Sequence, residues 1–389
     1  MLFDRVLETI EKNKQIKESG GYLGIPYRFP RLSEHIPIID RGQSIGFLGG
    51  TGIGKSRITR YLFLYSPYRF YKETGYKIKI LYFPLEDNKE KVYRNCICHY
   101  LFEEHNILIS PEELSSKKRV LPDFVLEKVR EARDYFEEFE DVVEFVDGLS
   151  TPREIFNFCQ RHALKVGTIH EKQRVNRQGI TITEKNYTSD THTIVLLDNM
   201  SNLDVDPDDD IDTERQAMIK LAKNYVREKL CNFFNFTVIQ VLQLAFDKEK
   251  QQFTHSGMTI LSKLEPSLDG IGEAKVISRS MHLVFGVFDP SKFELLHYPI
   301  PSKADPNNCY RIDILGDKFR ALKVLKNNDG AVGLRIGLKF NALAEVIEEL
   351  PQPKTEELDK IYKSLTDKVI EKPIIPLTFE EESDDEPPF

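Results

Sequence analysis

Residues 49–56 read Gly-Gly-Thr-Gly-Ile-Gly-Lys-Ser, which fits the pattern G-x-x-x-x-G-K-[ST] at every fixed position. The preceding residues 44–48 are apolar enough to form a buried strand, and residues 57–65 have the apolar spacing of a helix. This strand–loop–helix context is what a phosphate-binding loop requires. Glycines let backbone N–H groups surround a polyphosphate, and the helix N-terminus adds positive potential. The sequence therefore predicts a site for a nucleoside triphosphate.

The predicted nucleotide site includes the whole loop and the residue after it. Its members are Gly49, Gly50, Thr51, Gly52, Ile53, Gly54, Lys55, Ser56 and Arg57. Within this set we expect the ammonium group of Lys55 to reach the β- and γ-phosphates, and the hydroxyl of Ser56 to ligate Mg²⁺.

Composition predicts a cytoplasmic protein with a substantial core. The chain has 389 residues, of which 40% are hydrophobic, and this length allows one large or two ordinary domains. No stretch approaches the roughly 18 apolar residues of a membrane span, and the N-terminus lacks a signal-peptide pattern. The five cysteines form no CxxC pair, which favours a reducing compartment without structural zinc. The net charge of −8 is concentrated in the C-terminal tail, so it does not exclude a local nucleic-acid site.

From residue 19 to about residue 350, apolar strand-like runs alternate with longer, charged, helix-like segments. The apolar runs are residues 78–83, 142–146, 193–197, 237–242 and 282–288. Such alternation predicts an α/β fold in which helices flank a mostly parallel central sheet.

A short segment is expected on each side of this body. Residues 1–18 predict an amphipathic helix that ends at Ser19-Gly20-Gly21 and carries four apolar residues at helical spacing. These are Phe3, Val6, Leu7 and Ile10. Residues 351–389 predict a helix followed by a disordered acidic tail, because residues 371–389 are rich in proline and acids.

Two carboxylates and one amide follow predicted strands. Asp198 ends an apolar strand, which is the position that holds Mg²⁺ opposite Ser56. In an open parallel sheet the carboxyl ends of the strands face the ligand crevice. Glu86 is therefore either the general base that polarises the attacking water or a surface residue at the start of the next helix. Gln243 either contacts the γ-phosphate or is a hydrogen-bonded amide at a strand end.

The order and spacing of these motifs resemble the motor domain of the DnaB-type replicative DNA helicases, a RecA-like family of superfamily 4. The matching segments are Leu23-Gly-Ile-Pro-Tyr-Arg-Phe29, Leu81-Tyr-Phe-Pro-Leu-Glu-Asp87, Leu197-Asp198, Val238-Ile-Gln-Val-Leu-Gln-Leu244 and Lys326-Asn-Asn-Asp-Gly-Ala-Val-Gly333. The resemblance implies a RecA-like P-loop ATPase with ATP and Mg²⁺ as cofactors, Glu86 as general base and Gln243 as sensor. It also implies a homohexameric ring that holds ATP at its interfaces and translocates on single-stranded DNA.

The sequence departs from the family in two places. The arginine that the family supplies to a neighbour's ATP falls on Asn328, and loss of such a residue costs about 10³–10⁵ in turnover. Either Arg320, Arg335 or Lys323 replaces it, or the ring hydrolyses ATP slowly. Lys326 is retained, and we expect it to contact the γ-phosphate across the interface. The N-terminal collar or primase domain is absent, so the helix over residues 1–18 packs either on an adjacent subunit or on its own body.

Three segments are candidates for contacts with DNA or partners. The loop over residues 245–263 carries Lys248, Lys250 and Lys263, which either hold DNA phosphates or form a solvated loop. Residues 199–212 carry six aspartates, so this loop is expected to avoid DNA or to bind a partner or a cation. The basic residues 161–185 predict either a second nucleic-acid or partner surface or a mobile charged loop.

The C-terminus resembles the acidic tip of bacterial single-stranded-DNA-binding proteins. Phe389 is expected to fill an apolar pocket while Asp384, Asp385 and Glu386 meet a basic rim on a replisome partner. That partner would be a polymerase, a primase or a single-stranded-DNA-binding protein. The alternatives are a solubilising tail and a tail that competes with DNA.

Together these patterns predict an ATP-dependent replicative DNA helicase, encoded by a phage and acting in the cytoplasm of its bacterial host. Two other classes fit the same motifs: a RecA-like recombinase that forms a filament, and a weakly hydrolysing replisome scaffold that uses ATP to assemble.

Overall fold

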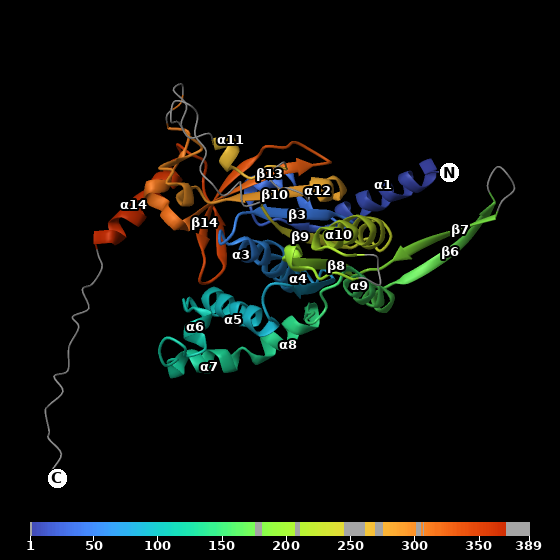
Figure 1. Ribbon diagram of the computed structural model, residues 1–389, viewed down its shortest axis with the longest axis horizontal. Helices are drawn as coiled ribbons and strands as arrows, with labels where there is room; N and C mark the ends of the chain where they lie inside the picture. The colour runs from blue at the N-terminus through green and yellow to red at the C-terminus, as the bar shows by residue number, and fades with distance from the viewer. Residues whose placement is uncertain are drawn as a thin grey trace, which may run out of the picture.

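The computed structural model describes residues 2–175, 181–206, 211–244, 261–268, 275–300, 305 and 307–370. A large twisted sheet forms the centre of the molecule, with helices on both of its faces (Figure 1). Within the described residues this sheet has nine strands. Their order is β15 (Val346–Glu349), β14 (Arg335–Asn341), β13 (Phe319–Asn327), β10 (Leu283–Phe288), β3 (Ser44–Gly49), β9 (Thr237–Gln243), β8 (His192–Asp198), β4 (Ile78–Pro84) and β5 (Val143–Phe145).

The strands from β10 to β5 are parallel to one another, and β13, β14 and β15 extend the sheet in antiparallel fashion. Every residue of β3 and of β8 is buried, as expected for parallel strands that are covered on both faces. The α/β fold with a mostly parallel sheet is confirmed. The antiparallel extension was not among the predicted strands.

The two faces of the sheet contribute to separate hydrophobic clusters. One cluster joins Ile45 and Phe47 of β3 to a helical segment made of α3 (Lys55–Arg60), η1 (Tyr61–Tyr65) and α4 (Ser66–Thr74). The other cluster joins Leu48 to α9 (Pro152–Val166), α10 (Glu214–Lys220) and η4 (Leu221–Cys231). Alternation of side chains along the strand therefore fixes which helices cover each face.

Local capping fixes where several helices start. Thr151 at the start of α9 and Thr213 at the start of α10 each form a capping box with the residue three positions later. This arrangement satisfies backbone N–H groups that a helix start leaves without partners. Gly75 ends α4 in the left-handed conformation, with φ of 70°.

Smaller elements complete the fold. A lobe with its own apolar cluster lies beside the sheet and contains α5 (Lys89–His105), α6 (Pro111–Leu114), α7 (Asp123–Glu131) and α8 (Arg133–Val142). The remaining elements are α2 (Pro30–His35), α11 (Leu261–Leu264), α12 (Lys275–Ser280), α13 (Ile312–Leu315), α14 (Glu356–Ile370), the short helices η2 (Met200–Asn202), η7 (Pro290–Phe293) and η8 (Gly316–Lys318), and the strand pairs β1 (Ile25–Pro26) with β2 (Ile38–Ile39) and β11 (His297–Tyr298) with β12 (Tyr310–Arg311).

A two-stranded arm projects from the body, formed by β6 (Thr168–Val175) and β7 (Thr181–Thr188) (Figure 1). The prediction of a charged loop over residues 161–185 was wrong, because this segment contains the end of α9 and most of the hairpin. The strands lack an apolar face, and their side chains are largely exposed. The periodicity that reveals a buried strand is therefore missing here.

The helix α1 (Leu2–Glu18) also projects from the body, at the same end as the arm (Figure 1). Phe3, Val6, Leu7 and Ile10 are between 41% and 69% exposed, so this apolar stripe is not buried against the described part of the chain. No helix within the described residues is both long and apolar enough to span a bilayer.

Glu265 joins the two edges of the antiparallel extension to the rest of the fold. Arg335 donates two hydrogen bonds of 2.9 Å to it, while Lys323 and Tyr298 each donate one of 2.6 Å. Burial alone would raise the pKa of Glu265, but these donors outweigh it and lower the pKa to about 2. The carboxylate therefore stabilises the fold at neutral pH.

We predict that Glu265→Gln lowers the free energy of unfolding by about 3 kcal/mol at pH 7, because it removes one member of a buried charged cluster. A folded-state pKa below the unfolded value means that this stability is complete above about pH 5. It is lost as the pH falls toward 2. Chemical denaturation across this range measures the difference. Glu348→Gln, in an exposed pair with Lys339, is the control and should change stability by less than about 1 kcal/mol. Equal effects of the two variants at pH 7 would contradict the assignment.

Candidate nucleotide-binding and active site

The phosphate loop, residues 49–56, connects the end of β3 to the start of α3. Gly54 has φ of 89°, a conformation that side chains with a Cβ rarely adopt, and a Cβ there would lie 2.5 Å from Phe340 Cζ. A Cβ on Gly49 would lie 2.4 Å from Ile53 Cδ1. Both positions therefore require glycine, and the loop can hold its backbone N–H groups close to a phosphate.

The strand register brings the other predicted residues to the same edge of the sheet. Gly49 at the end of β3 lies beside Gln243 at the end of β9, and Asp198 at the end of β8 lies beside Pro84 at the end of β4. Glu86 follows β4 by two residues. This edge is the carboxyl edge of the parallel strands, where ligands bind in open α/β sheets.

The side chains of Ser56 and Asp198 meet. The hydroxyl of Ser56 donates to Asp198 Oδ1 at 2.8 Å, and the hydroxyl of Tyr82 donates to Oδ2 at 2.7 Å. Burial raises the pKa of Asp198, while Arg60, Tyr82 and Ser56 act in the opposite direction. A hydroxyl beside a carboxylate is the donor set that P-loop proteins use for Mg²⁺.

Hydrogen bonds from three directions hold the phosphate loop in place. Lys55 Nζ donates to the carbonyl of Gly50 at 2.6 Å, and Gln243 Nε2 donates to Thr51 Oγ1 at 2.7 Å. Arg320 Nε donates to the carbonyl of Ile53 at 2.7 Å. Gln243 thus couples the phosphate loop directly to the strand end that precedes residue 245.

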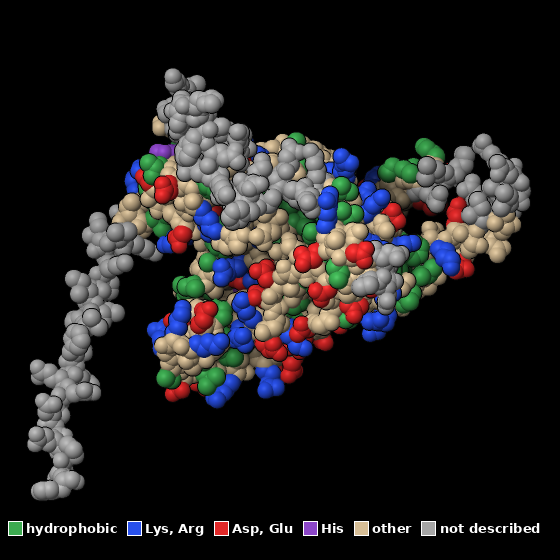
Figure 2. All heavy atoms as spheres, viewed as in Figure 1, with side chains coloured by type: hydrophobic (Ala, Val, Ile, Leu, Met, Phe, Trp, Pro, Cys, Tyr) green, Lys and Arg blue, Asp and Glu red, His purple; other side chains and the backbone are tan. Residues whose placement is uncertain are grey.

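The loop opens into a cavity of about 330 Å³ between α3 and the α5–α6 lobe. Figure 2 shows this side of the molecule hollowed, with Lys and Arg side chains along the hollow. Lining residues include Lys55, Ser56, Glu86 and Gln243, so the structure brings most of the predicted catalytic set together. The strained glycines, the lysine and the Ser56–Asp198 pair fit Mg·ATP.

The lobe adds cations to this cavity that sequence reasoning did not assign to the nucleotide. These are Lys91 and Arg94 on α5 and Lys117 after α6. Nothing in their local sequence distinguishes them from solvated basic residues, because their role depends on how α5 and α6 fold over the loop.

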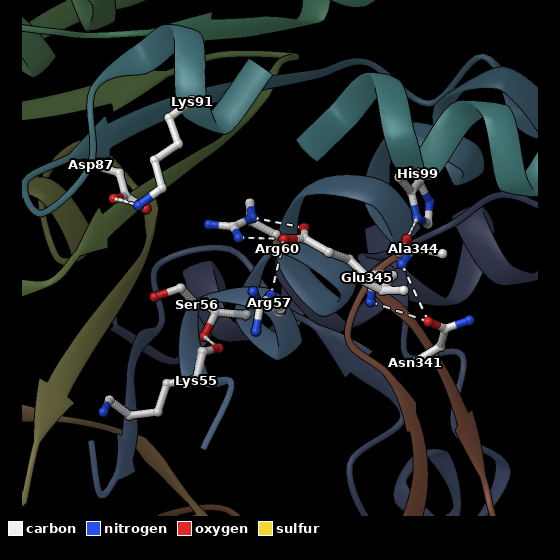
Figure 3. A network of polar contacts seen from close by, with 12 residues as sticks. Lys55, Ser56, Arg57, Arg60, Asp87, Lys91, His99, Asn341, Ala344 and Glu345 are labelled. Carbon is white, nitrogen blue, oxygen red and sulfur yellow. Dashed lines mark hydrogen bonds and ion pairs between the residues drawn. The ribbon is translucent and has the colours of Figure 1, made fainter. Parts of the chain in front are cut away.

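A buried polar network behind the cavity was also missed. Arg60, three residues into the helix beyond Arg57, forms hydrogen bonds with Glu345 and Tyr82, and both residues are close to the metal-binding pair (Figure 3). Arg60 and Glu345 are 3% and 1% exposed. A charged residue within an otherwise apolar helix, such as Arg60 in Ile58–Leu64, is the pattern that could have indicated it.

Lys326 does not lie in the cavity. Its Nζ donates to the carbonyls of Ser278 and Met281 at the end of α12, at 2.9 and 2.5 Å. The contact with a neighbour's γ-phosphate therefore stays a prediction that requires these bonds to break. Asn328 donates its backbone N–H to the carbonyl of His282.

The three proposed substitutes for the arginine at position 328 all have partners within the chain. Arg320 pairs with Asp289 at 3.1 Å besides holding the phosphate loop. Arg335 and Lys323 both pair with Glu265. Each of the three would have to give up these contacts in order to reach the nucleotide of a neighbouring subunit.

The structure gives partial information on the other candidate segments. Lys248 and Lys250 lie outside the described residues, as do Asp384, Asp385, Glu386 and Phe389, and Lys263 is described only as part of the backbone of α11. In the aspartate-rich loop, Asp204 accepts a hydrogen bond from Ser150, and Asp206 pairs with Arg153 at the start of α9.

A phosphate loop between a central parallel strand and a helix, with a carboxylate on a nearby strand, defines a RecA-like P-loop nucleoside triphosphatase fold. No protein-family model and no curated protein matches the sequence. Among solved structures, the chain is similar to the ATPase domain of a phage-related DnaB-like helicase, with a TM-score of 0.62 and 14% identity over 90% of this chain and 98% of that one. It is also similar to a DnaB-like replicative helicase studied with primase, with a TM-score of 0.58 and 14% identity over 90% of this chain and 67% of that one. The chain therefore has the fold of a DnaB-like helicase ATPase domain, as the sequence predicted.

We predict that Arg320→Lys weakens nucleotide binding about fivefold, because the variant keeps a charge beside Asp289 but loses the bond to Ile53, worth about 1 kcal/mol. Titration with a fluorescent ADP measures this change. Arg311→Lys, in an exposed pair with Asp313, is the matched control and should leave the affinity unchanged. Unchanged affinity in Arg320→Lys would show that Arg320 does not hold the loop.

Proposed function

We propose that this protein is an ATP-driven DNA helicase that translocates on single-stranded DNA as a hexameric ring. The observation that carries this proposal is the cavity that joins Lys55 and Ser56 to Glu86 and Gln243, on a fold shared with DnaB-like helicase ATPase domains. The fold alone is compatible with other ATPases. The combination of a candidate base and a candidate sensor favours a motor.

Each residue has a defined task in this mechanism. Mg·ATP, when bound, supplies the phosphoryl group and the cation that neutralises it. Lys55 adds positive charge beside the phosphates, and Ser56 with Asp198 provides the oxygen ligands. Glu86 accepts the proton of the attacking water. Gln243 contacts Thr51 of the loop at one end and leads into residues 245–263 at the other, so a change in the loop is passed to that segment.

We propose that residues 245–263 contact DNA through Lys248, Lys250 and Lys263, whose charge suits a grip on phosphates that is independent of sequence. Helix α1 supplies a second inter-subunit contact, since its exposed apolar stripe, residues 3–10, belongs to none of the core clusters of the described chain. Such a motor would act in the cytoplasm of a bacterial host.

A weakly hydrolysing scaffold is the second candidate. The observations that favour it are Asn328 at the position of the family's arginine and the engagement of Lys326, Arg320, Arg335 and Lys323 in contacts within the chain. A protein without a cation to supply to the neighbouring site would bind ATP and turn it over slowly.

The decisive experiment measures ATP hydrolysis with and without single-stranded DNA, for the unaltered protein and for Glu86→Gln. We expect DNA to stimulate turnover and Glu86→Gln to lower it about 10²–10⁴-fold, the usual contribution of a general base, while nucleotide affinity is retained. Glu90→Gln, an exposed neighbour on α5, is the control. Nucleotide binding without DNA-stimulated turnover would reject the motor and leave the scaffold.

The acidic tail yields a separate prediction. We propose that residues 384–389 dock a replisome protein, because a terminal aromatic beside acids suits an apolar pocket with a basic rim. Deletion of these residues should abolish capture of purified replisome partners such as a polymerase, a primase or a single-stranded-DNA-binding protein. ATP hydrolysis should be unchanged. Retained partner binding by the truncated protein would refute this role.

A further inference from the structure

Arg60 lies between two buried carboxylates, those of Asp198 and Glu345. Its Nε donates to Glu345 Oε2 at 2.9 Å and its Nη2 to Oε1 at 2.5 Å, whereas its closest approach to Asp198 is 3.6 Å, from Nη1 to Oδ2. All three side chains are at most 4% exposed. Figure 3 shows the guanidinium turned to the Glu345 carboxylate. Arg60 is therefore committed to Glu345 rather than to Asp198.

Contacts independent of Arg60 fix the position of Glu345. The hydroxyl of Tyr65 donates to Glu345 Oε2 at 2.8 Å, and His99 Nδ1 donates to the adjacent carbonyl of Ala344 at 2.9 Å. The side chain of Asn341 accepts hydrogen bonds from two backbone N–H groups of the same turn. Glu345 itself has φ of 52°, a conformation that a non-glycine residue adopts only when its surroundings impose it.

The division of Arg60 between the two carboxylates matters for the metal site. A bidentate guanidinium–carboxylate pair is among the strongest charge-assisted hydrogen-bond arrangements, and low dielectric surroundings strengthen it. If Arg60 formed such a pair with Asp198, it would compete with a cation for the same oxygens. The charge on Glu345 offsets that of Arg60 and leaves Asp198 to accept from Ser56 and Tyr82.

We propose that Glu345 is a positioning residue that holds Arg60 away from Asp198 and so keeps this carboxylate available to the Mg²⁺ that accompanies the nucleotide. This inference rests on the proposed function only in requiring Mg²⁺-dependent nucleotide binding, and not in requiring DNA translocation. The turn that carries Glu345 also contributes Ala342 and Leu343 to the wall of the nucleotide cavity. The residue that controls Arg60 therefore belongs to the same structural unit that a bound nucleotide touches.

The test is a titration of fluorescent N-methylanthraniloyl-ADP binding against Mg²⁺ concentration, which needs no hydrolysis. In Glu345→Gln, Arg60 loses its counter-charge and pairs with Asp198. We expect the Mg²⁺ concentration for half-maximal enhancement of binding to rise about tenfold, as for loss of other residues that orient metal ligands. Nucleotide affinity without Mg²⁺ should be unchanged.

A second variant separates this role from simple support of the fold. Arg60→Met with Glu345→Leu removes both charges, a replacement that buried ion pairs commonly tolerate. Since no cation then competes for Asp198, the Mg²⁺ midpoint should return to that of the unaltered protein. A role in packing alone predicts no recovery. Glu349→Gln, which breaks the pair with Arg31 in the same part of the sheet but outside the cavity, is the matched control and should leave the midpoint unchanged.

The outcomes are distinct. An unchanged midpoint in Glu345→Gln, or a raised midpoint in the folded double variant, would overturn the inference. If Glu345→Gln does not fold, the double variant alone decides by the same criterion. Absence of Mg²⁺-dependent ADP binding in the unaltered protein would instead reject the nucleotide site on which the proposed function rests.

Discussion

The structure depends on placing an ionised carboxylate, Asp198, where solvent does not reach it. Burying a charge costs several kcal/mol unless partners compensate for it. Asp198 is 4% exposed and receives hydrogen bonds from Ser56 and Tyr82, with Arg60 nearby. These partners come from the helix after the phosphate loop and from the neighbouring strand. The carboxylate is stable only when β3, β4 and β8 are in register, so the same interaction that prepares the metal site also fixes the centre of the sheet.

The features that could be predicted from sequence are local ones. The phosphate loop is a contiguous pattern whose glycines are each required by backbone geometry, as Gly54 shows. The runs at residues 78–83, 193–197 and 237–242 are apolar throughout because these strands are buried on both faces, and that property is visible without any partner. Asp198, Glu86 and Gln243 could be selected for the same reason, because each follows such a strand.

The features that could not be predicted depend on residues that are far apart in the chain. Arg60 and Glu345 are separated by 285 positions, and nothing near either residue indicates the other. Glu265 and Arg335 are 70 positions apart. The arm over residues 168–188 escaped for a different reason. Its strands bury no face against the body, so neither apolar alternation nor an apolar run marks them.

The antiparallel strands β13, β14 and β15 connect these observations. They bring Arg320 and Phe340 against the phosphate loop and place the turn with Glu345 behind it. The phosphate loop is thus gripped from its own strand, from β9 through Gln243, and from the extension of the sheet. A single loop of eight residues reports on three separate regions of the chain.

The arm has a mechanical consequence. Each strand has eight residues and so spans about 26 Å. Its own ladder is continuous, but at its base the side-chain bonds to the body include those from Tyr187 to the carbonyl of Ala163 and from Ser189 to the carbonyl of Val166. A force at the far end acts on these few bonds through a long lever, while the ladder distributes it over many. The arm is therefore a stiff rod on a compliant joint, able to change direction without losing its own structure.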